Sequence, residues 1–208
     1  VTVGTGWYRG RLPGPVEKNK YKYKEPAELI CEIIIYYKDG RKESIYSDKT
    51  WEYAKSKILL SDIYDGETYD ADYNDTDNKS VAVDKNAAKS NLVLQRNSFV
   101  KEQERVKPMR FFVTPKGEKV IDFGQEITGY TEFTVTAKKG DRIKISHGEI
   151  LDKQGNFYNA NYRSAVAEIN YICKDGKQTY KPQLTFFGFR YIRLDEFPFE
   201  VDLNNFTA

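Results

Sequence analysis

Two short segments of this chain carry residue types that could do chemistry. Residues 145–152 read ISHGEILD and contain His147, the only histidine of the sequence, two residues before Glu149. Histidine titrates near neutral pH and a carboxylate can orient it, so a role as general acid or base has to be considered. Residues 61–71 read SDIYDGETYDA, in which acidic residues are interspersed with tyrosines. Carboxylates accept hydrogen bonds from hydroxyl groups and tyrosine rings stack on sugars, so this segment favours carbohydrate contact.

For His147 the residues favour a structural role over a catalytic one. Strand alternation over residues 142–151 places His147 and Glu149 on the same face as three aliphatic side chains. Polar groups on a core-facing side need partners, and Arg163 is the expected counter-charge for Glu149. The sequence contains no Gly-x-Ser-x-Gly elbow, no His-x-x-x-His pair and no Walker-type loop, and one histidine cannot build a histidine-rich metal site. We therefore expect His147, Glu149 and Arg163 to form a structural polar cluster.

The elements that position these segments are predicted to be strands. Apolar residues recur with period two between turns rich in Gly and Asp. The predicted strands cover residues 29–37, 43–47, 119–123, 130–137, 142–149, 168–174, 178–182 and 189–194. The turns at 38–41 and 175–177 predict hairpins between their flanking strands. No long segment has apolar residues at helical spacing, so the fold class is expected to be all-β, with β-sandwiches as the architecture.

A change of composition marks the expected domain boundary. Residues 70–90 are acidic and poor in large apolar side chains, which favours a solvated connection. We place a first domain at 1–85, a second at 91–199, and a connector at 200–208. The opening VTVGTG reads like the end of a strand. The first sandwich is therefore expected to be incomplete and the chain to be a piece of a longer protein.

Charge and hydropathy argue against two classes of partner. The 33 basic and 31 acidic residues nearly cancel, which leaves no global field to attract nucleic acid or an anionic membrane. Residues 17–26, EKNKYKYKEP, alternate lysine with tyrosine, but a solvated loop explains them better than nucleic-acid binding. No apolar run approaches the roughly 20 residues of a membrane span. Cys31 and Cys173 are expected to be small core residues of strands, with a disulfide left open.

Several segments, taken together, resemble the bacterial α-L-rhamnosidases, which are family 78 of the glycoside hydrolases. The matching segments are GWYRG at 6–10, SDIYDGETYDA at 61–71, DFGQEITGY at 122–130, HGEILDKQG at 147–155, NYRSA at 161–165 and KPQLTFFGFRY at 181–191. The third departs from the family's D-F-G-Q-N-x-x-G-W, because Glu126 and Tyr130 stand in place of Asn and Trp. Each match alone is weak, but they follow the family's order and cover nearly the whole chain.

The resemblance implies two consecutive β-sandwich domains, jelly-roll-like and concanavalin-like, before an (α/α)₆ catalytic barrel. It implies a parent enzyme that removes terminal α-L-rhamnose from glycans or glycosides with inversion, using carboxylates of that barrel. This chain is then expected to be inactive by itself and to act as a scaffold whose partners are a rhamnose-containing glycan and its own downstream barrel. In some members the first sandwich is a calcium-dependent rhamnose-binding module, so calcium is a candidate cofactor, although no defined ligand spacing supports it.

The acidic and aromatic residues near the first two matches are the candidates for sugar contact. They are Trp7, Tyr8, Asp62, Tyr64, Asp65, Glu67, Tyr69 and Asp70. We expect Asp62, Tyr64 and Glu67 to form a partly exposed cluster at a sandwich edge, against the alternative of a loop that only buttresses the structure. A free-standing lectin-like protein and a hydrolase that uses carboxylates of this chain alone remain alternative functions. The natural substrate and the compartment stay open, with a secreted or periplasmic location favoured over a cytoplasmic one.

Overall fold

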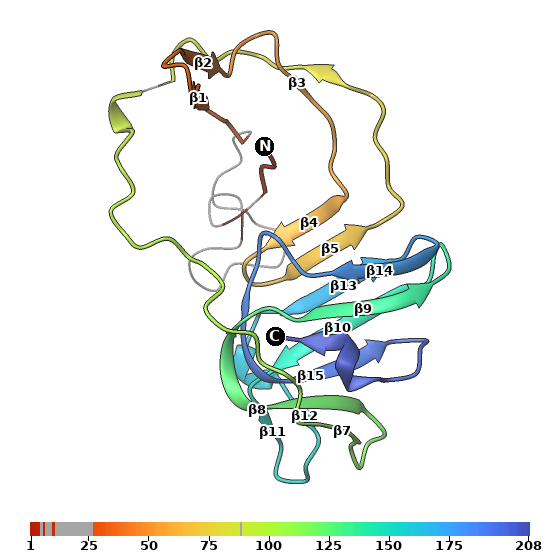
Figure 1. Ribbon diagram of the computed structural model, residues 1–208. Helices are drawn as coiled ribbons and strands as arrows, with labels where there is room; N and C mark the ends of the chain where they lie inside the picture. Colours follow the sequence, from red (N-terminus) through yellow and green to blue (C-terminus); the bar gives the residue numbers. More distant parts are fainter. Residues whose placement is uncertain (5, 7–9, 11–26, 88) are drawn as a thin grey trace. The chain divides into compact units, whose positions relative to one another are not determined.

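The structure, a computed structural model, describes residues 1–4, 6, 10, 27–87 and 89–208 (Figure 1). The candidate residues Trp7 and Tyr8 and the lysine–tyrosine segment 17–26 lie outside the described residues. The chain forms two compact units, each assembled from separate stretches of sequence. The smaller unit contains residues 26–55 and 75–103, as far as these are described, and the larger one contains 56–74 and 104–208 with the described residues near the amino terminus.

The smaller unit contains two antiparallel ribbons and the 3₁₀ turn η1 (Lys89–Asn91). Strand β1 (Glu32–Tyr36) pairs with β2 (Lys42–Tyr46), which confirms the hairpin expected around residues 38–41. Strand β3 (Glu52–Tyr53) pairs with β6 (Lys79–Ser80). The apolar side chains of the hairpin are widely exposed, with Ile33 at 44% and Tyr36 at 73%. The apolar core of the described residues therefore lies in the larger unit.

The larger unit is a β-sandwich of two sheets (Figure 1). The first sheet has seven strands in the order β4 (Ile58–Asp62), β5 (Gly66–Asp70), β13 (Glu168–Ile172), β10 (Arg142–Gly148), β15 (Phe187–Glu196), β8 (Lys119–Gly129) and β7 (Arg110–Val113). The second has three, in the order β14 (Gly176–Tyr180), β9 (Glu132–Ala137) and β16 (Phe206–Thr207). The unit also contains a ribbon of β11 (Ile150–Leu151) and β12 (Phe157–Tyr158) and the 3₁₀ turns η2 (Ala160–Tyr162) and η3 (Leu203–Asn205).

Alternation along the strands builds the core between these two sheets. Strand β9 buries Phe133 and Val135, and β13 of the other sheet buries Ile169 and Tyr171. The rings of Phe133 and Tyr171 meet edge to face with centroids 5.5 Å apart, so the two sheets share one apolar interior. The described part of the chain has no helical segment longer than a single 3₁₀ turn. The expected all-β sandwich class is confirmed.

Two tight connections run between the sheets. Strands β9 and β10 belong to different sheets, and so do β13 and β14. The hairpin expected around residues 175–177 is therefore wrong, because β14 begins at Gly176 and pairs with β9. The two connections bind each other, since the Gly140 N–H donates to the carbonyl oxygen of Cys173 at 2.9 Å. A hairpin within one sheet and a tight connection between two sheets need the same turn residues, so the local sequence does not distinguish them.

Strands β4 and β5 belong to the seven-stranded sheet, although the sequence placed them in a first domain at 1–85. Strand β5 runs parallel to β13, with Glu67 opposite Ile169. Gly66 begins β5 with φ of +100°, and a Cβ atom there would lie 1.9 Å from the carbonyl oxygen of Glu168. Only glycine permits this approach of two backbones. The chain leaves the larger unit after Asn74 and returns to it at Glu104.

The described residues show whether any helix could span a membrane and whether the two cysteines form a disulfide. None of the helical turns there is long and apolar enough to cross a membrane. Cys31 and Cys173 are both free thiols. Cys173 is fully buried, as expected of a core residue, whereas Cys31, which lies just before β1 in the smaller unit, is partly exposed. Burial raises the pKa of the Cys173 thiol to about 11, so it stays protonated at neutral pH.

Candidate functional site

The carboxylate of Glu67 ties β5 to the segment between β14 and β15. The side chain is 1% exposed, and its Oε1 accepts a hydrogen bond from the phenol of Tyr180 at 2.5 Å. The backbone N–H groups of Gln183 and Leu184 donate to the same carboxylate at 3.2 and 3.1 Å. Burial, with the neighbouring charge of Glu67, raises the pKa of the Tyr180 phenol far above its usual value, so the phenol keeps its proton as a donor. Glu67 thus holds the sandwich together and is closed to a ligand.

Asp62 begins the turn between β4 and β5. Its buried Oδ1 accepts hydrogen bonds from the backbone N–H groups of Tyr64 and Asp65 at 2.8 and 3.2 Å, which is an Asx turn. The backbone carbonyls of Tyr64 and Asp65 then accept hydrogen bonds from Ala167 and Glu168 at 2.9 and 3.1 Å. The turn is therefore fastened to the segment that enters β13. A partly exposed cluster was the wrong expectation for Asp62 and Glu67, because both are buried. Asp62 is bound by backbone N–H groups of its own turn, and Glu67 by donors more than a hundred residues away in sequence.

Tyr64, Asp65, Tyr69 and Asp70 keep partly exposed side chains. Asp70 is occupied in a turn of its own, since its Oδ1 accepts from the backbone N–H groups of Asp72 and Tyr73 at 2.9 and 3.1 Å. Tyr69 stacks on Tyr171 with ring centroids 5.6 Å apart and planes 5° from parallel. Among the candidates for sugar contact that the structure describes, Tyr69 lines a cavity.

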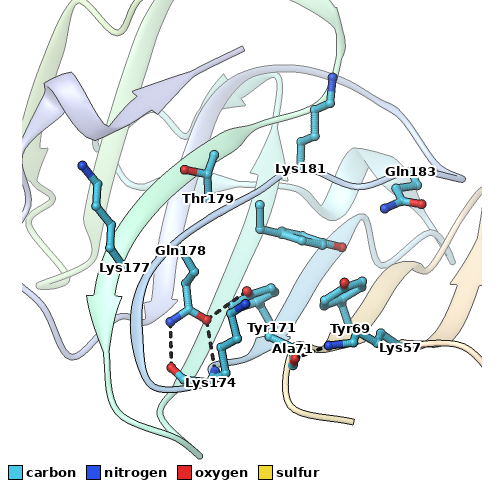
Figure 2. Close-up of a pocket in the computed structure, with 11 residues that line it drawn as sticks. Lys57, Tyr69, Ala71, Tyr171, Lys174, Lys177, Gln178, Thr179, Lys181 and Gln183 are labelled. Carbon is cyan, nitrogen blue, oxygen red and sulfur yellow. Dashed lines mark hydrogen bonds between the residues drawn. The ribbon is translucent and has the colours of Figure 1, made fainter. Parts of the chain in front are cut away.

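This cavity has a volume of about 550 Å³ and lies beside β5, β13 and β14 of the larger unit (Figure 2). We call it the tyrosine–lysine cavity, after its main lining residues Tyr69, Tyr171, Tyr180, Lys57, Lys174, Lys177 and Lys181. None of the described residues that line it is acidic. It therefore combines aromatic surface with positive charge.

Gln178 fixes the wall of the cavity, and sequence reasoning gave it no role. Its side chain is buried, and its Oε1 accepts hydrogen bonds from the Tyr171 phenol and the Lys174 N–H, both at 3.0 Å. Its Nε2 donates to the carbonyl of Lys174 at 2.8 Å (Figure 2). The same atom donates to the carbonyl of Gly176 at 2.9 Å. A single side-chain amide thus satisfies three backbone polar groups of the connection between β13 and β14. The only local sequence signal for this role was a glutamine placed just after the glycine-containing turn at 175–177.

His147 lies deep inside the sandwich. Its side chain is 0% exposed, and its ring stacks on Phe187 with centroids 3.9 Å apart. Nδ1 lies 2.9 Å from the carbonyl oxygen of Ala167 and Nε2 lies 3.2 Å from Oγ1 of Thr131. These partners assign the proton to Nδ1, which donates to the carbonyl while Nε2 accepts from the hydroxyl. Burial lowers the pKa of His147 to about 3, so the imidazole is neutral and fully engaged in holding the structure.

Glu149 and Arg163 do not join His147. Strand β10 ends at Gly148, so the alternation that should carry Glu149 inward stops one residue too early. The Oε2 atom of Glu149 instead accepts a hydrogen bond from the side-chain amide of Asn161 at 2.7 Å. Arg163 is exposed, and among the described residues it forms no ion pair with Glu149. The expected ion pair is wrong.

Asp122 and Arg190, which lie in two of the matched segments, form an ion pair in which Asp122 is buried and Arg190 is partly exposed. Asp122 accepts from Arg190 at two positions, Nε to Oδ1 at 2.8 Å and Nη2 to Oδ2 at 3.1 Å. The N–H of Gly124 and Nε of Arg110 complete its partners at 2.7 and 3.2 Å. Burial alone would raise the pKa of Asp122, but these hydrogen bonds outweigh it and hold the pKa below its usual value. The pair joins β8 to β15.

A second set of matched residues gathers around Glu149. Burial and the charge of Glu149 together raise the pKa of Glu126. Burial, Glu149 and Glu126 in turn raise the pKa of Tyr162, whose hydroxyl donates to the carbonyl of Gly188. The segments at 122–130, 147–155, 161–165 and 181–191 therefore converge in one polar cluster. Sequence reasoning found these segments but not their convergence.

The acidic side chains do not assemble into a metal site in the part of the chain that is described. No group of three or more His, Cys, Asp or Glu side chains there is placed to hold an ion. The carboxylates of Asp62 and Asp70 are both occupied by backbone N–H groups. The described residues thus give calcium no ligand set.

Comparison with known proteins identifies the family. Residues 1–112 match the model of the α-L-rhamnosidase N-terminal domain. Residues 113–208 match that of the bacterial α-L-rhamnosidase concanavalin-like domain. The chain belongs to the bacterial α-L-rhamnosidase family. The resemblance seen in the sequence segments is confirmed.

Individual relatives cover nearly the whole chain. An α-L-rhamnosidase of Formosa agariphila is 34% identical over 95% of it, and one of Streptomyces avermitilis is 33% identical over 94%. The crystal structure of native α-L-rhamnosidase from Aspergillus terreus superposes with a TM-score of 0.81 at 28% identity, covering 99% of this chain and 25% of that one. The structure of S. avermitilis α-L-rhamnosidase complexed with L-rhamnose gives 0.77 at 29%, covering 86% and 18%. The chain spans 22% and 20% of the two curated relatives.

Proposed function

We propose that this chain is the amino-terminal β-sandwich region of an α-L-rhamnosidase, a glycoside hydrolase that releases terminal α-L-rhamnose with inversion. The observation that carries the proposal is the match of two consecutive family domains, over 1–112 and 113–208. Similarity to the rhamnose-bound S. avermitilis enzyme over 86% of the chain supports a rhamnose-containing substrate.

The role we assign to the chain itself is that of a scaffold. Inverting hydrolysis needs two opposed carboxyl groups about 6.5–9.5 Å apart, with room for a water molecule and the sugar between them. Glu67 and Asp122 are instead buried and engaged by several protein donors each. We therefore assign the catalytic acid and base to a helical barrel outside these 208 residues. Residues 206–207 are not a connector, as the sequence suggested, because they form strand β16 of the sandwich. The segment of β4, β5 and the turn between them contributes Tyr64, Asp65 and Tyr69 as partly exposed candidates for sugar contact.

The test compares the 208-residue chain with the product of its complete natural gene, using p-nitrophenyl α-L-rhamnopyranoside as substrate. We expect the gene product to release p-nitrophenol and the chain alone to release none. Proton NMR of the first product should show β-L-rhamnose, because inversion changes the anomeric configuration.

Each part of the proposal can fail separately. A gene product that binds L-rhamnose without hydrolysing the substrate would favour a lectin over a hydrolase. Turnover by the purified chain that is lost on mutation of one of its own carboxylates would overturn the scaffold role.

A further inference from the structure

The tyrosine–lysine cavity is not needed for the scaffold role described above. We propose that it binds an anionic saccharide unit, that is, a sugar residue carrying a carboxylate or a sulfate group. This inference does not rest on the hydrolase activity, because binding is measured on the chain itself.

The first argument is a local excess of positive charge. Four lysines, Lys57, Lys174, Lys177 and Lys181, line the cavity, and no acidic side chain is among its described lining residues. The chain as a whole carries 33 basic and 31 acidic residues, so this concentration is not a property of its general composition. A concave site lined by one sign of charge focuses its field on a ligand of the opposite sign.

The ammonium groups of Lys174 and Lys177 are available to a ligand, whereas those of Lys57 and Lys181 already make contacts within the protein. Nζ of Lys57 donates to the carbonyl of Ala71 at 2.6 Å, and Nζ of Lys181 lies 5.4 Å from the ring centroid of Tyr130. Lys174 and Lys177 are exposed, and neither forms an ion pair with any residue that the structure describes. They are therefore the pair that we assign to the anionic group.

The second argument is the aromatic wall. Tyr69, Tyr171 and Tyr180 pack together with centroid separations of 4.6–5.6 Å, and Tyr69 keeps part of its ring exposed. The phenols of Tyr171 and Tyr180 are already bound to Gln178 and Glu67, and these two side chains are buried, so the ring surface that the wall presents to a ligand is that of Tyr69. A pyranose ring stacks on such a surface through its C–H groups.

The wall is also rigid before any ligand arrives. Gln178 and Glu67, both buried, each hold several partners and fix the tyrosines in place. Preorganisation of this kind lowers the ordering cost of binding. The cavity volume of about 550 Å³ lies within the roughly 300–1,000 Å³ of small-ligand sites. One or two sugar units of an acidic glycan would fit this space.

The experiment is calorimetric titration of the 208-residue chain with two anionic probes and their neutral counterparts. The first pair is digalacturonate and its dimethyl ester, and the second is a 6-O-sulfated disaccharide and its unsulfated parent. We expect an anionic probe to bind at least tenfold more tightly than its neutral counterpart, and less tightly in 0.5 M salt because exposed charges are screened. Binding of digalacturonate alone identifies a uronate as the natural group, and binding of the sulfated probe alone identifies a sulfate ester.

Matched variants locate the site. Lys174→Gln with Lys177→Gln should weaken binding by about tenfold, as expected for two exposed charge-assisted contacts. Lys119→Gln with Lys153→Gln removes the same charge from exposed positions outside the cavity and should change affinity less than twofold. Tyr69→Leu should weaken sugar probes but not inorganic sulfate.

Several results would overturn the proposal. Equal weakening by both lysine pairs would show a general charge effect, and inorganic sulfate binding as tightly as the sugars would show an anion site without saccharide recognition. Failure of both anionic probes to bind would remove the ligand class, and tighter binding of an acidic peptide than of either sugar would assign the cavity to a protein partner. None of these outcomes bears on whether the complete gene product hydrolyses rhamnosides.

Discussion

The phenol of Tyr180 donates a 2.5 Å hydrogen bond to the carboxylate of Glu67, 113 residues earlier in the chain. Glu67 lies in β5 of the seven-stranded sheet, and Tyr180 lies in β14 of the three-stranded sheet. The bond therefore fastens the two layers of the sandwich to each other, and among the described residues no cation forms an ion pair with the buried carboxylate.

Removal of this phenol should destabilise the larger unit. Tyr180→Phe leaves Glu67 with its two backbone donors, and loss of a hydrogen bond to a buried charged group costs about 1.5–3 kcal/mol. The measurement is the free energy of unfolding from urea titration. Tyr158→Phe, on the partly exposed ribbon β12, is the control and should change it by less than about 0.5 kcal/mol. Equal effects of the two variants would show that the Glu67 bond contributes nothing of its own.

The buried His147 should make stability fall in acid. Its pKa is about 3 in the folded protein against 6.5 for the exposed side chain, so between these values the unfolded chain binds one more proton. The contribution is thus fully present above pH 6.5 and decreases as the pH falls, by about 1.4 kcal/mol per pH unit. Unfolding titrations at pH 4, 5, 6 and 7 measure it.

The comparison with His147→Gln isolates this contribution, because the carboxylates of the chain titrate in both proteins. The difference in unfolding free energy between parent and variant should narrow steadily below pH 6.5. Parallel curves over the whole range would show that His147 is exposed or already charged in the folded state.

Replacement of the Asp122 carboxylate by an isosteric amide should destabilise the protein, because the ion pair with Arg190 is lost. Asp122→Asn keeps the shape but replaces an acceptor oxygen by an NH₂ group that faces Arg190, so we expect a loss of about 1.5–3 kcal/mol. Glu132→Gln provides the control, since its partner Arg105 is largely exposed and such surface pairs contribute under about 1 kcal/mol. If the thermal unfolding curves of Asp122→Asn and of the control coincided, the Asp122–Arg190 pair would not stabilise the packing of β8 against β15.

Gly66 should be the least replaceable glycine in the described larger unit. Gly66→Ala brings a methyl group to 1.9 Å from the carbonyl oxygen of Glu168 at a φ of +100°, so strands β5 and β13 must separate. We expect a loss of more than about 3 kcal/mol, from the clash and the left-handed backbone together. Gly117→Ala shares the positive φ, at +83°, but has open space around it and should cost only about 1–2 kcal/mol. Similar losses in both would mean that β5 does not approach β13 this closely.

The sequence by itself determined the fold class, one hairpin and the family. Period-two alternation is a local property, and it placed Ile143, Ile145 and His147 correctly on a core-facing side. The turn around Gly40 has the residues of a hairpin and forms one. The family segments are read in sequence order, so no knowledge of their spatial arrangement was needed to find them.

Only the tertiary structure decided which strands pair and which carboxylates are buried. The parallel pairing of β5 with β13 joins residues about a hundred positions apart, and nothing in the local pattern of either strand specifies its partner. The acidic loop read as a sugar-binding surface, yet Glu67 is enclosed because Tyr180, Gln183 and Leu184 bring donors to it from the far end of the chain. Whether a carboxylate meets solvent or protein depends on groups that only folding brings near, which is why its environment could not be predicted from its neighbours in sequence.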